Sequence, residues 1–153
     1  GASPAPMNAF LLNFGLETLP VSMPKHCSNA LKVAQYLEKH PRVSWVNCPD
    51  LPGNKYHSLA AKYLPGGTCG VVSFGLKGGR EAAVKFMDKL KFVAIVTHVA
   101  DARTSVLHPA SHTHQQLSEE QLIEARVPVD MIRLSLGIED PEDIINDLKQ
   151  ALE

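Results

Sequence analysis

Arg133 is the first residue of this sequence whose side chain needs a chemical partner. It lies in the stretch MIRLSL, residues 131–136, which alternates as a β-strand does, so that its residues divide between two faces. Three aliphatic side chains form the face that we expect to be buried: Ile132, Leu134 and Leu136. Arg133 lies on the other face, between Met131 and Ser135, just before a glycine.

Two interpretations of Arg133 are open. A strand arginine is commonly solvated or paired with a neighbouring carboxylate. A guanidinium is also planar, and its donors match the two oxygens of a carboxylate, so Arg133 could bind a ligand held above the sheet. Sequence spacing does not choose between these interpretations.

Histidines form the other group with chemical potential. The stretch HPASHTH carries His108, His112 and His114, and His98 precedes it. No single strand or helix would place these side chains on one face, and no cysteine or carboxylate beside them completes a ligand set. We therefore expect ordinary hydrogen bonds here and no metal site.

The remaining candidates for chemistry are weak. Cys69 and Ser73 have no evident base partner, so we expect no catalytic nucleophile in this chain. The glycine-rich stretches LPGGTCG and LKGGRE lack the spacing and the GK[ST] ending of a phosphate-binding P-loop. Turns are the better interpretation of both stretches.

Composition limits the class of protein. The chain has 153 residues, 44% of them apolar, which suffices for one domain with its own core. Fifteen basic and sixteen acidic residues leave it near neutral, so we expect no nucleic-acid partner. The longest aliphatic or aromatic run, 92–96, is too short to span a bilayer, and the first residues lack the pattern of a signal peptide. Three cysteines without a CxxC pair favour a reduced, cytoplasmic location over a disulfide framework.

Hydrophobic periodicity predicts alternating helices and strands. A helix is expected over Met7–Leu19, ended by Pro20, and a second over Ser28–His40. Further helices are expected at 57–64, at 78–90, at 118–127 with Ser118 as N-cap, and after Asp140, with Pro141 at the first position. Strands are expected at 43–48, 70–77, 92–100, 104–110 and 131–136.

These elements predict an α+β fold, with an open, largely antiparallel sheet and helices covering one of its faces. The whole of 1–153 is expected to be one domain. Residues 1–40 would form a helical linker segment, and residues 41–153 an α/β sandwich.

Several long stretches together resemble a known family. They are GASPAPMNAFLLNFGLETL, HPRVSWVNCPDLPGNKYHSLAAKYL, GVVSFGLKGG, SVLHPASHTHQQLSEEQ and VDMIRLSLGIEDPEDIINDLKQAL. In this order they are similar to the small C-terminal domain of the fold-type I pyridoxal-phosphate-dependent enzymes of cysteine and methionine metabolism. The resemblance covers nearly the whole chain and is nearest to the O-acetylhomoserine sulfhydrylase branch, in which ADA at 100–102 resembles a GDA stretch.

The resemblance implies an enzyme of methionine biosynthesis that makes homocysteine from O-acetylhomoserine and sulfide. Its cofactor, pyridoxal 5'-phosphate, would be bound by a preceding large domain that this chain lacks. No lysine here has the Ser-x-Thr-Lys-like neighbours of the family's cofactor lysine, so the isolated chain is expected to be inactive. The partners implied are an amino-acid substrate, the large domain, and further copies in a homotetramer.

The resemblance also assigns substrate-binding residues by motif position. Arg133 corresponds to the arginine that binds the substrate carboxylate. His98 and Val99 correspond to a serine or asparagine position and the backbone beside it, which contact the same carboxylate. His98 departs from the family there, so its backbone is the better candidate. Thr113 corresponds to a threonine beside the carboxylate, and Thr97 to a position facing the substrate's side chain.

Two alternatives stay open. The chain could belong to a methionine or cystathionine γ-lyase of the same family, which would release ammonia and an α-keto acid. It could instead be a stand-alone amino-acid-binding or interaction module.

Overall fold

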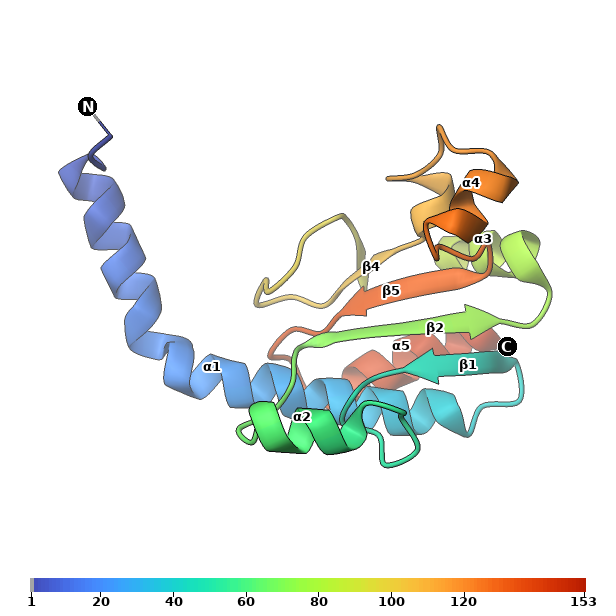
Figure 1. The fold of residues 1–153 in the computed structure, drawn as a ribbon, viewed down its shortest axis with the longest axis horizontal. Helices are drawn as coiled ribbons and strands as arrows, with labels where there is room; N and C mark the ends of the chain where they lie inside the picture. The colour runs from blue at the N-terminus through green and yellow to red at the C-terminus, as the bar shows by residue number, and fades with distance from the viewer. Residues whose placement is uncertain (1) are drawn as a thin grey trace.

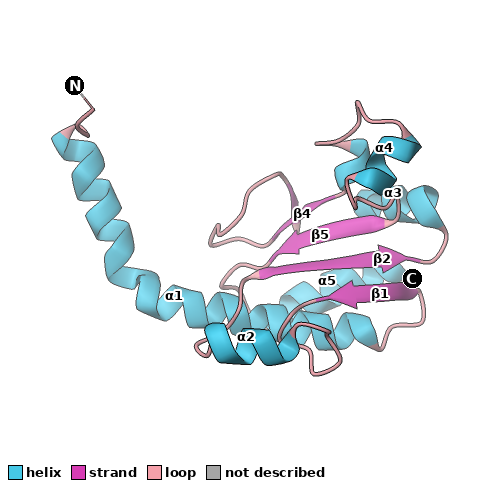
Figure 2. Ribbon diagram, viewed as in Figure 1, coloured by secondary structure: helices cyan, strands magenta, loops and turns pink. Residues whose placement is uncertain are grey.

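A five-stranded sheet forms the centre of the computed structural model, which describes residues 2–153. Its strands lie in the spatial order β1-β2-β5-β4-β3. Figures 1 and 2 label the first four of these strands. Their bounds are Val43–Asn47 for β1, Val71–Leu76 for β2, Ala94–Ile95 for β3, Ser105–Leu107 for β4 and Met131–Ser135 for β5. Three neighbouring pairs are antiparallel, and β3 runs parallel to β4. The expected, largely antiparallel α+β sheet is therefore confirmed.

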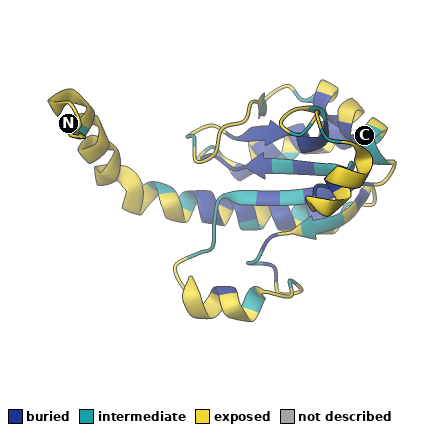
Figure 3. Cartoon of the chain, turned by 45° about the horizontal axis from the view of Figure 1, so that its top comes forward, coloured by how far each residue is buried: buried dark blue, intermediate teal, exposed yellow. Residues whose placement is uncertain are grey.

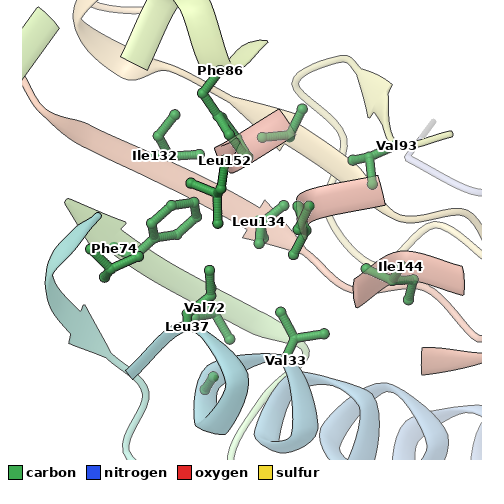
Figure 4. Packing of buried hydrophobic residues seen from close by; sticks show 14 of the residues in the cluster. Val33, Leu37, Val72, Phe74, Phe86, Val93, Ile132, Leu134, Ile144 and Leu152 are labelled. Atoms are coloured by element: carbon green, nitrogen blue, oxygen red, sulfur yellow. The ribbon is translucent and has the colours of Figure 1, made fainter. Parts of the chain in front are cut away.

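Three helices cover one face of this sheet: α1 (Pro6–Glu38), α3 (Gly79–Lys89) and α5 (Pro141–Leu152). Alternation in β5 turns Ile132 and Leu134 toward these helices, where both are fully buried. Figure 4 shows them in one cluster with Val33 and Leu37 of α1 and with side chains of β2, α3 and α5. The opposite face of β5 is left for Arg133.

The prediction that Pro20 ends the first helix was wrong, because α1 continues through Pro20 and Pro24. Each proline removes one helical hydrogen bond. Here the freed carbonyls lie on an exposed part of the helix, which solvent can reach. The half after these prolines is fixed by packing, and the first half projects away from the sheet with its side chains exposed (Figure 3). No helix among residues 2–153 is long and apolar enough to cross a membrane.

The strand expected over 92–100 was also mostly wrong, since β3 contains only Ala94 and Ile95. Asp147 of α5 accepts the N–H groups of Lys91, Phe92 and Val93, so these groups cannot join a strand ladder. Burial of Asp147 acts against its ionised form, but these three donors and the side-chain amide of Gln150 outweigh burial and hold its pKa below the ordinary value. Beyond β3 the chain forms a loop.

The other predicted helix and strand boundaries differ less from those of the structure. The strand expected over 104–110 stops at Leu107, because Pro109 begins a short 3-10 helix, η1 (Pro109–Ser111). The helix expected over 57–64 is α2 (His57–Tyr63), and the helix expected over 118–127 is α4 (Glu119–Glu124). α4 ends early, with Arg126 at a φ of 57°.

Both predicted helix caps are confirmed. Ser118 accepts the N–H of Gln121, whose side chain accepts the N–H of Ser118 in return. Asp140 accepts the N–H of Glu142 at the start of α5.

Candidate carboxylate-binding site

Arg133 lies on the sheet face opposite α1, α3 and α5, beside the part of that face where Met131 packs against η1 and α4. Its cross-strand neighbours are Ser73 on β2 and Leu107 on β4. The side chain is half-buried, and its Nη2 atom donates to the carbonyl oxygen of Thr97 at 3.1 Å. Its Nε atom is buried and has no hydrogen-bond partner among residues 2–153.

This arrangement differs from the solvated or carboxylate-paired arginine that strands commonly carry. In the part of the chain that the structure describes, no carboxylate lies within ion-pair distance of the guanidinium. A half-buried positive charge with an incomplete set of acceptors gains from an anionic ligand. The geometry therefore fits a carboxylate bound on this face of the sheet.

The loop that contacts Arg133 is fixed by two serines. Ser105 donates to the carbonyl oxygen of His98 at 3.0 Å, and Ser135 accepts the N–H of Ala100 at 3.1 Å. The two serines are buried cross-strand neighbours on β4 and β5. They hold the chain on both sides of Val99, where Ala100 adopts a φ of 62° that an alanine takes only when its surroundings impose it.

The N–H groups of His98 and Val99 remain available in this loop. Neither donates to any group within residues 2–153. They directly follow Thr97, whose carbonyl oxygen contacts Arg133. The peptide between Thr97 and His98 is trans, so the N–H of His98 points away from Arg133. The N–H of Val99 is therefore the better candidate to bind an anion together with the guanidinium.

The end of the same loop is attached to residues that follow β5. Thr104 donates through both its N–H and its hydroxyl to the carboxylate of Glu139, the hydroxyl at 2.9 Å. Thr104 also accepts the N–H of Gly137 at 2.9 Å. A Cβ on Gly137 would lie 2.3 Å from the carbonyl oxygen of Ala102, so only glycine permits this close approach.

Helix α1 holds this turn from the other side. His26 bonds to the carbonyl oxygen of Leu136 at 2.6 Å, which requires a proton on its Nδ1 because a carbonyl only accepts. Asn29 donates to the carbonyl oxygens of Gly137 and Glu139 at 2.9 and 2.8 Å. The packed half of α1 is thus tied to the turn that follows β5.

Sequence reasoning did not identify the residues that hold the loop: Thr104, Ser105, Ser135, Gly137 and Glu139. A signal was nevertheless present in RLSLGIE, where every second residue after Arg133 is polar or glycine. Alternation continued past the strand would have placed these positions on the side of Arg133.

Of the residues assigned by resemblance, Thr97, His98 and Val99 lie together beside Arg133, and all three are exposed. The imidazole of His98 lies 3.4 Å from the carboxylate of Asp101, within its own loop. The N–H of Arg103 holds the pKa of Asp101 below its ordinary value, and His98 adds to this effect. The side chain of His98 therefore has a partner other than Arg133.

Thr113 is not brought to Arg133 by any hydrogen bond. It is exposed in the turn after η1, and its hydroxyl lies 2.9 Å from Nδ1 of its neighbour His114. The role of Thr113 beside the substrate carboxylate, which was assigned by resemblance, stays a prediction.

The histidines of HPASHTH make separate local contacts. His108 is fully buried, its Nε2 atom bonds to the carbonyl oxygen of Val129 at 2.8 Å, and burial lowers its pKa. His112 bonds to the carbonyl oxygen of His108 at 3.0 Å. Within residues 2–153 no group of three or more His, Cys, Asp or Glu side chains is placed to hold a metal ion.

A small cavity of about 180 Å³ lies between α1 and the loop that follows β3, and Arg133 does not line it. Its lining includes Val99, Ala100 and Ser135 together with His26 and Cys69. Its size suits a small group.

The cofactor implied by the resemblance does not fit these residues. Its aldehyde needs a lysine amine in a protected site, and every lysine of the chain is exposed except the half-buried Lys25. Lys25 lies on α1, beside Thr18, Val21 and Ile138, and does not line the cavity next to Val99. What the chain offers instead is a guanidinium without a carboxylate partner among residues 2–153.

Comparison with known families matches residues 1–153 to the family described as Cys/Met metabolism PLP-dependent enzyme, where PLP is pyridoxal phosphate. Similar proteins include a homocysteine synthase of Schizosaccharomyces pombe, 47% identical over all of this chain and 36% of that protein. An O-acetyl-L-homoserine sulfhydrylase of Leptospira meyeri is 44% identical over 99% of this chain and 35% of its own length. An L-methionine gamma-lyase of Treponema denticola is 42% identical over all of this chain and 38% of its own length.

A solved structure shares the fold. It is a crystal structure from Campylobacter jejuni, provisionally named an O-acetylhomoserine (thiol)-lyase, which contains an N'-pyridoxyl-lysine-5'-monophosphate. It is 46% identical, has a TM-score of 0.90, and is matched over 99% of this chain and 36% of that chain. The chain thus spans a little over a third of the length of these relatives. It belongs to the family of PLP-dependent enzymes of cysteine and methionine metabolism.

Proposed function

We propose that this chain is the C-terminal, substrate-binding part of a PLP-dependent O-acetylhomoserine sulfhydrylase, which makes homocysteine from O-acetylhomoserine and sulfide. Within that enzyme the chain binds the α-carboxylate of the amino acid. The observation that supports this role is the half-buried Arg133, which has no carboxylate partner among residues 2–153 and contacts the loop that carries the free N–H group of Val99.

The chemistry at the amino acid would come from the cofactor, which acts as an electron sink for the bonds at Cα. The part played by this chain is binding and orientation. Arg133 fixes two carboxylate oxygens with its planar donors, and the N–H group of Val99 limits rotation of the carboxylate. Fixing the carboxylate sets which bond at Cα faces the cofactor ring, and small displacements of such groups are expensive.

The two threonines complete the proposed site. Thr97 and Thr113 both have exposed side chains. Thr97, next to the carboxylate site, would face the side chain of the substrate, and Thr113 would lie beside the carboxylate. A cytoplasmic location and assembly as a homotetramer belong to the same proposal.

The reaction is tested with the full-length protein. With O-acetyl-L-homoserine and sulfide, we expect homocysteine to form faster than ammonia and α-keto acid form from L-methionine. The reverse ratio would assign the protein to the γ-lyases, which the 42% identity to a methionine gamma-lyase makes the second candidate.

The stand-alone module is tested by calorimetry. That alternative requires the isolated chain to bind an amino acid measurably. The proposal expects no turnover by the isolated chain, because no lysine in it fits the cofactor.

A further inference from the structure

Four alternate residues of RLSLGIE, beginning with Arg133, contact the loop of residues 97–104. Arg133 contacts Thr97, and Ser135 contacts Ala100. Two positions on, Gly137 packs against the backbone of 102 and 103 and donates to Thr104. Two further on, Glu139 accepts twice from Thr104. β5 and the residues that follow it, up to Glu139, thus contact the segment 97–104 from its first residue to its last.

Only the first of these contacts involves a residue proposed to bind substrate. The other three fix where the segment lies relative to Arg133. Ser135, with its neighbour Ser105, sets the direction of the peptide groups on either side of Val99. Glu139 fixes the far end of the segment, where Thr104 is buried.

From this geometry we propose that Ser135 and Glu139 are positioning residues for the substrate carboxylate. They hold the segment 97–104 so that the N–H group of Val99 and the guanidinium of Arg133 converge on one anion. The role rests on the function proposed above and goes beyond it, because neither side chain would contact the substrate.

A purely structural role is the alternative. Ser135 is buried, and the side chain of Glu139 is tied at both oxygens, so removing either could simply destabilise the fold. A structural role would lower the melting temperature and the amount of active enzyme, and it would leave the KM of the active fraction unchanged. A positioning role would instead raise the KM for the amino acid.

The test uses Ser135→Ala and Glu139→Gln in the full-length enzyme. Each should raise the KM for O-acetyl-L-homoserine roughly 10- to 100-fold, because an anion site displaced by about 1 Å loses that much. The KM for sulfide should not change, since sulfide carries no carboxylate. Ser135→Thr, which keeps the hydroxyl, should restore most of the affinity. Ser44→Ala, a serine on β1 at the opposite edge of the sheet, should behave as wild type.

A readout independent of activity is amide hydrogen exchange. Exchange within 97–104 should be faster in both variants, while the core strands exchange as in wild type. In an Arg133→Ala background, Ser135→Ala should raise the KM no more than about twofold further, because coupled residues are not additive.

The outcomes separate the two proposals. If Arg133→Ala leaves the KM for the amino acid unchanged, both the carboxylate site and the positioning role are wrong. If Arg133→Ala raises that KM but Ser135→Ala and Glu139→Gln do not, only the positioning role is overturned. A wild-type KM together with a lowered melting temperature would assign the two residues a structural role and equally overturn it.

Discussion

Arg133 donates to the carbonyl oxygen of Thr97 at 3.1 Å, although the two residues lie 36 positions apart. This hydrogen bond joins the sheet face opposite α1, α3 and α5 to the loop that follows β3. It orients the guanidinium and leaves its remaining donors without a carboxylate partner in the described chain. The conformation of this loop in turn depends on the hydroxyl groups of Ser105 and Ser135 and on the close approach that Gly137 permits.

Gly137→Ala tests how closely the loop packs on β5. The added Cβ would meet the carbonyl oxygen of Ala102 at 2.3 Å and the backbone of Arg103 at 2.6 Å. Backbone atoms yield little, so we expect the free energy of unfolding to fall by about 1–3 kcal/mol in chemical denaturation. Gly66→Ala is the matched control, because its Cβ would have no neighbour within 4 Å. Equal stability of the two variants would contradict the packing described here.

The lowered pKa of His108 predicts that the protein loses stability in mild acid. Burial lowers its pKa in the folded protein below the ordinary 6.5, so the folded state binds fewer protons than the unfolded state in the interval between the two values. The contribution is therefore complete above about pH 6.5 and is lost as the pH falls toward the lowered value. His40 adds to the same trend, because burial and the nearby Arg42 also lower its pKa.

His108→Gln separates the contribution of His108. Glutamine does not titrate, and its amide can replace the donor that bonds to Val129. Urea unfolding between pH 5 and 7.5 should show a shallower dependence on pH in this variant than in wild type. Identical slopes would mean that His108 does not titrate differently in the folded and unfolded states.

The first half of α1 predicts self-association of the isolated chain. Seven large apolar side chains are exposed there: Met7, Phe10, Leu11, Leu12, Phe14, Leu16 and Leu19. Such a surface tends to associate in water, and we expect weak dimers in sedimentation experiments at high concentration. Leu11→Gln combined with Phe14→Gln should weaken them, whereas Val84→Gln on the exposed side of α3 should not. A strictly monomeric wild-type chain would show that this surface does not associate.

Local pattern was enough to predict much of the fold. The alternation of 131–136 identified the buried face of β5 correctly, because in a strand every second side chain points the same way. Ser118 and Asp140 were predicted as helix caps because their side-chain oxygens satisfy N–H groups that a helix start leaves free. These features depend on residues only a few positions apart.

The missed features depend on distant contacts. Residues 92–100 were expected to form a strand, but Asp147 binds the N–H groups before β3, and Ser135 and Glu139 fix the loop after it; all three lie more than 30 positions along the chain. α1 passes through two prolines because its second half is packed against the sheet, which its local sequence does not reveal. Local pattern could not identify Thr97 as the hydrogen-bond partner of Arg133 either, because the two residues lie 36 positions apart.

Arg133 tests the central claim most directly. Removing one member of a charge-assisted pair costs about 2–5 kcal/mol, and about 1.4 kcal/mol is a factor of ten. In the full-length enzyme, Arg133→Ala should therefore lower kcat/KM by roughly 30-fold to several thousand-fold. Arg133→Lys should recover little, because an ammonium group lacks the planar pair of donors. Arg126→Ala, which removes an exposed arginine outside the site, is the control.

The decisive measurement is kcat/KM and the melting temperature on the same Arg133→Ala protein. The side chain faces away from the core, so the free energy of unfolding should fall by about 1 kcal/mol at most. A large loss of kcat/KM with a nearly unchanged melting temperature is the predicted result. A clear loss of stability with wild-type kcat/KM in the folded fraction would contradict the account and remove Arg133 from the substrate site.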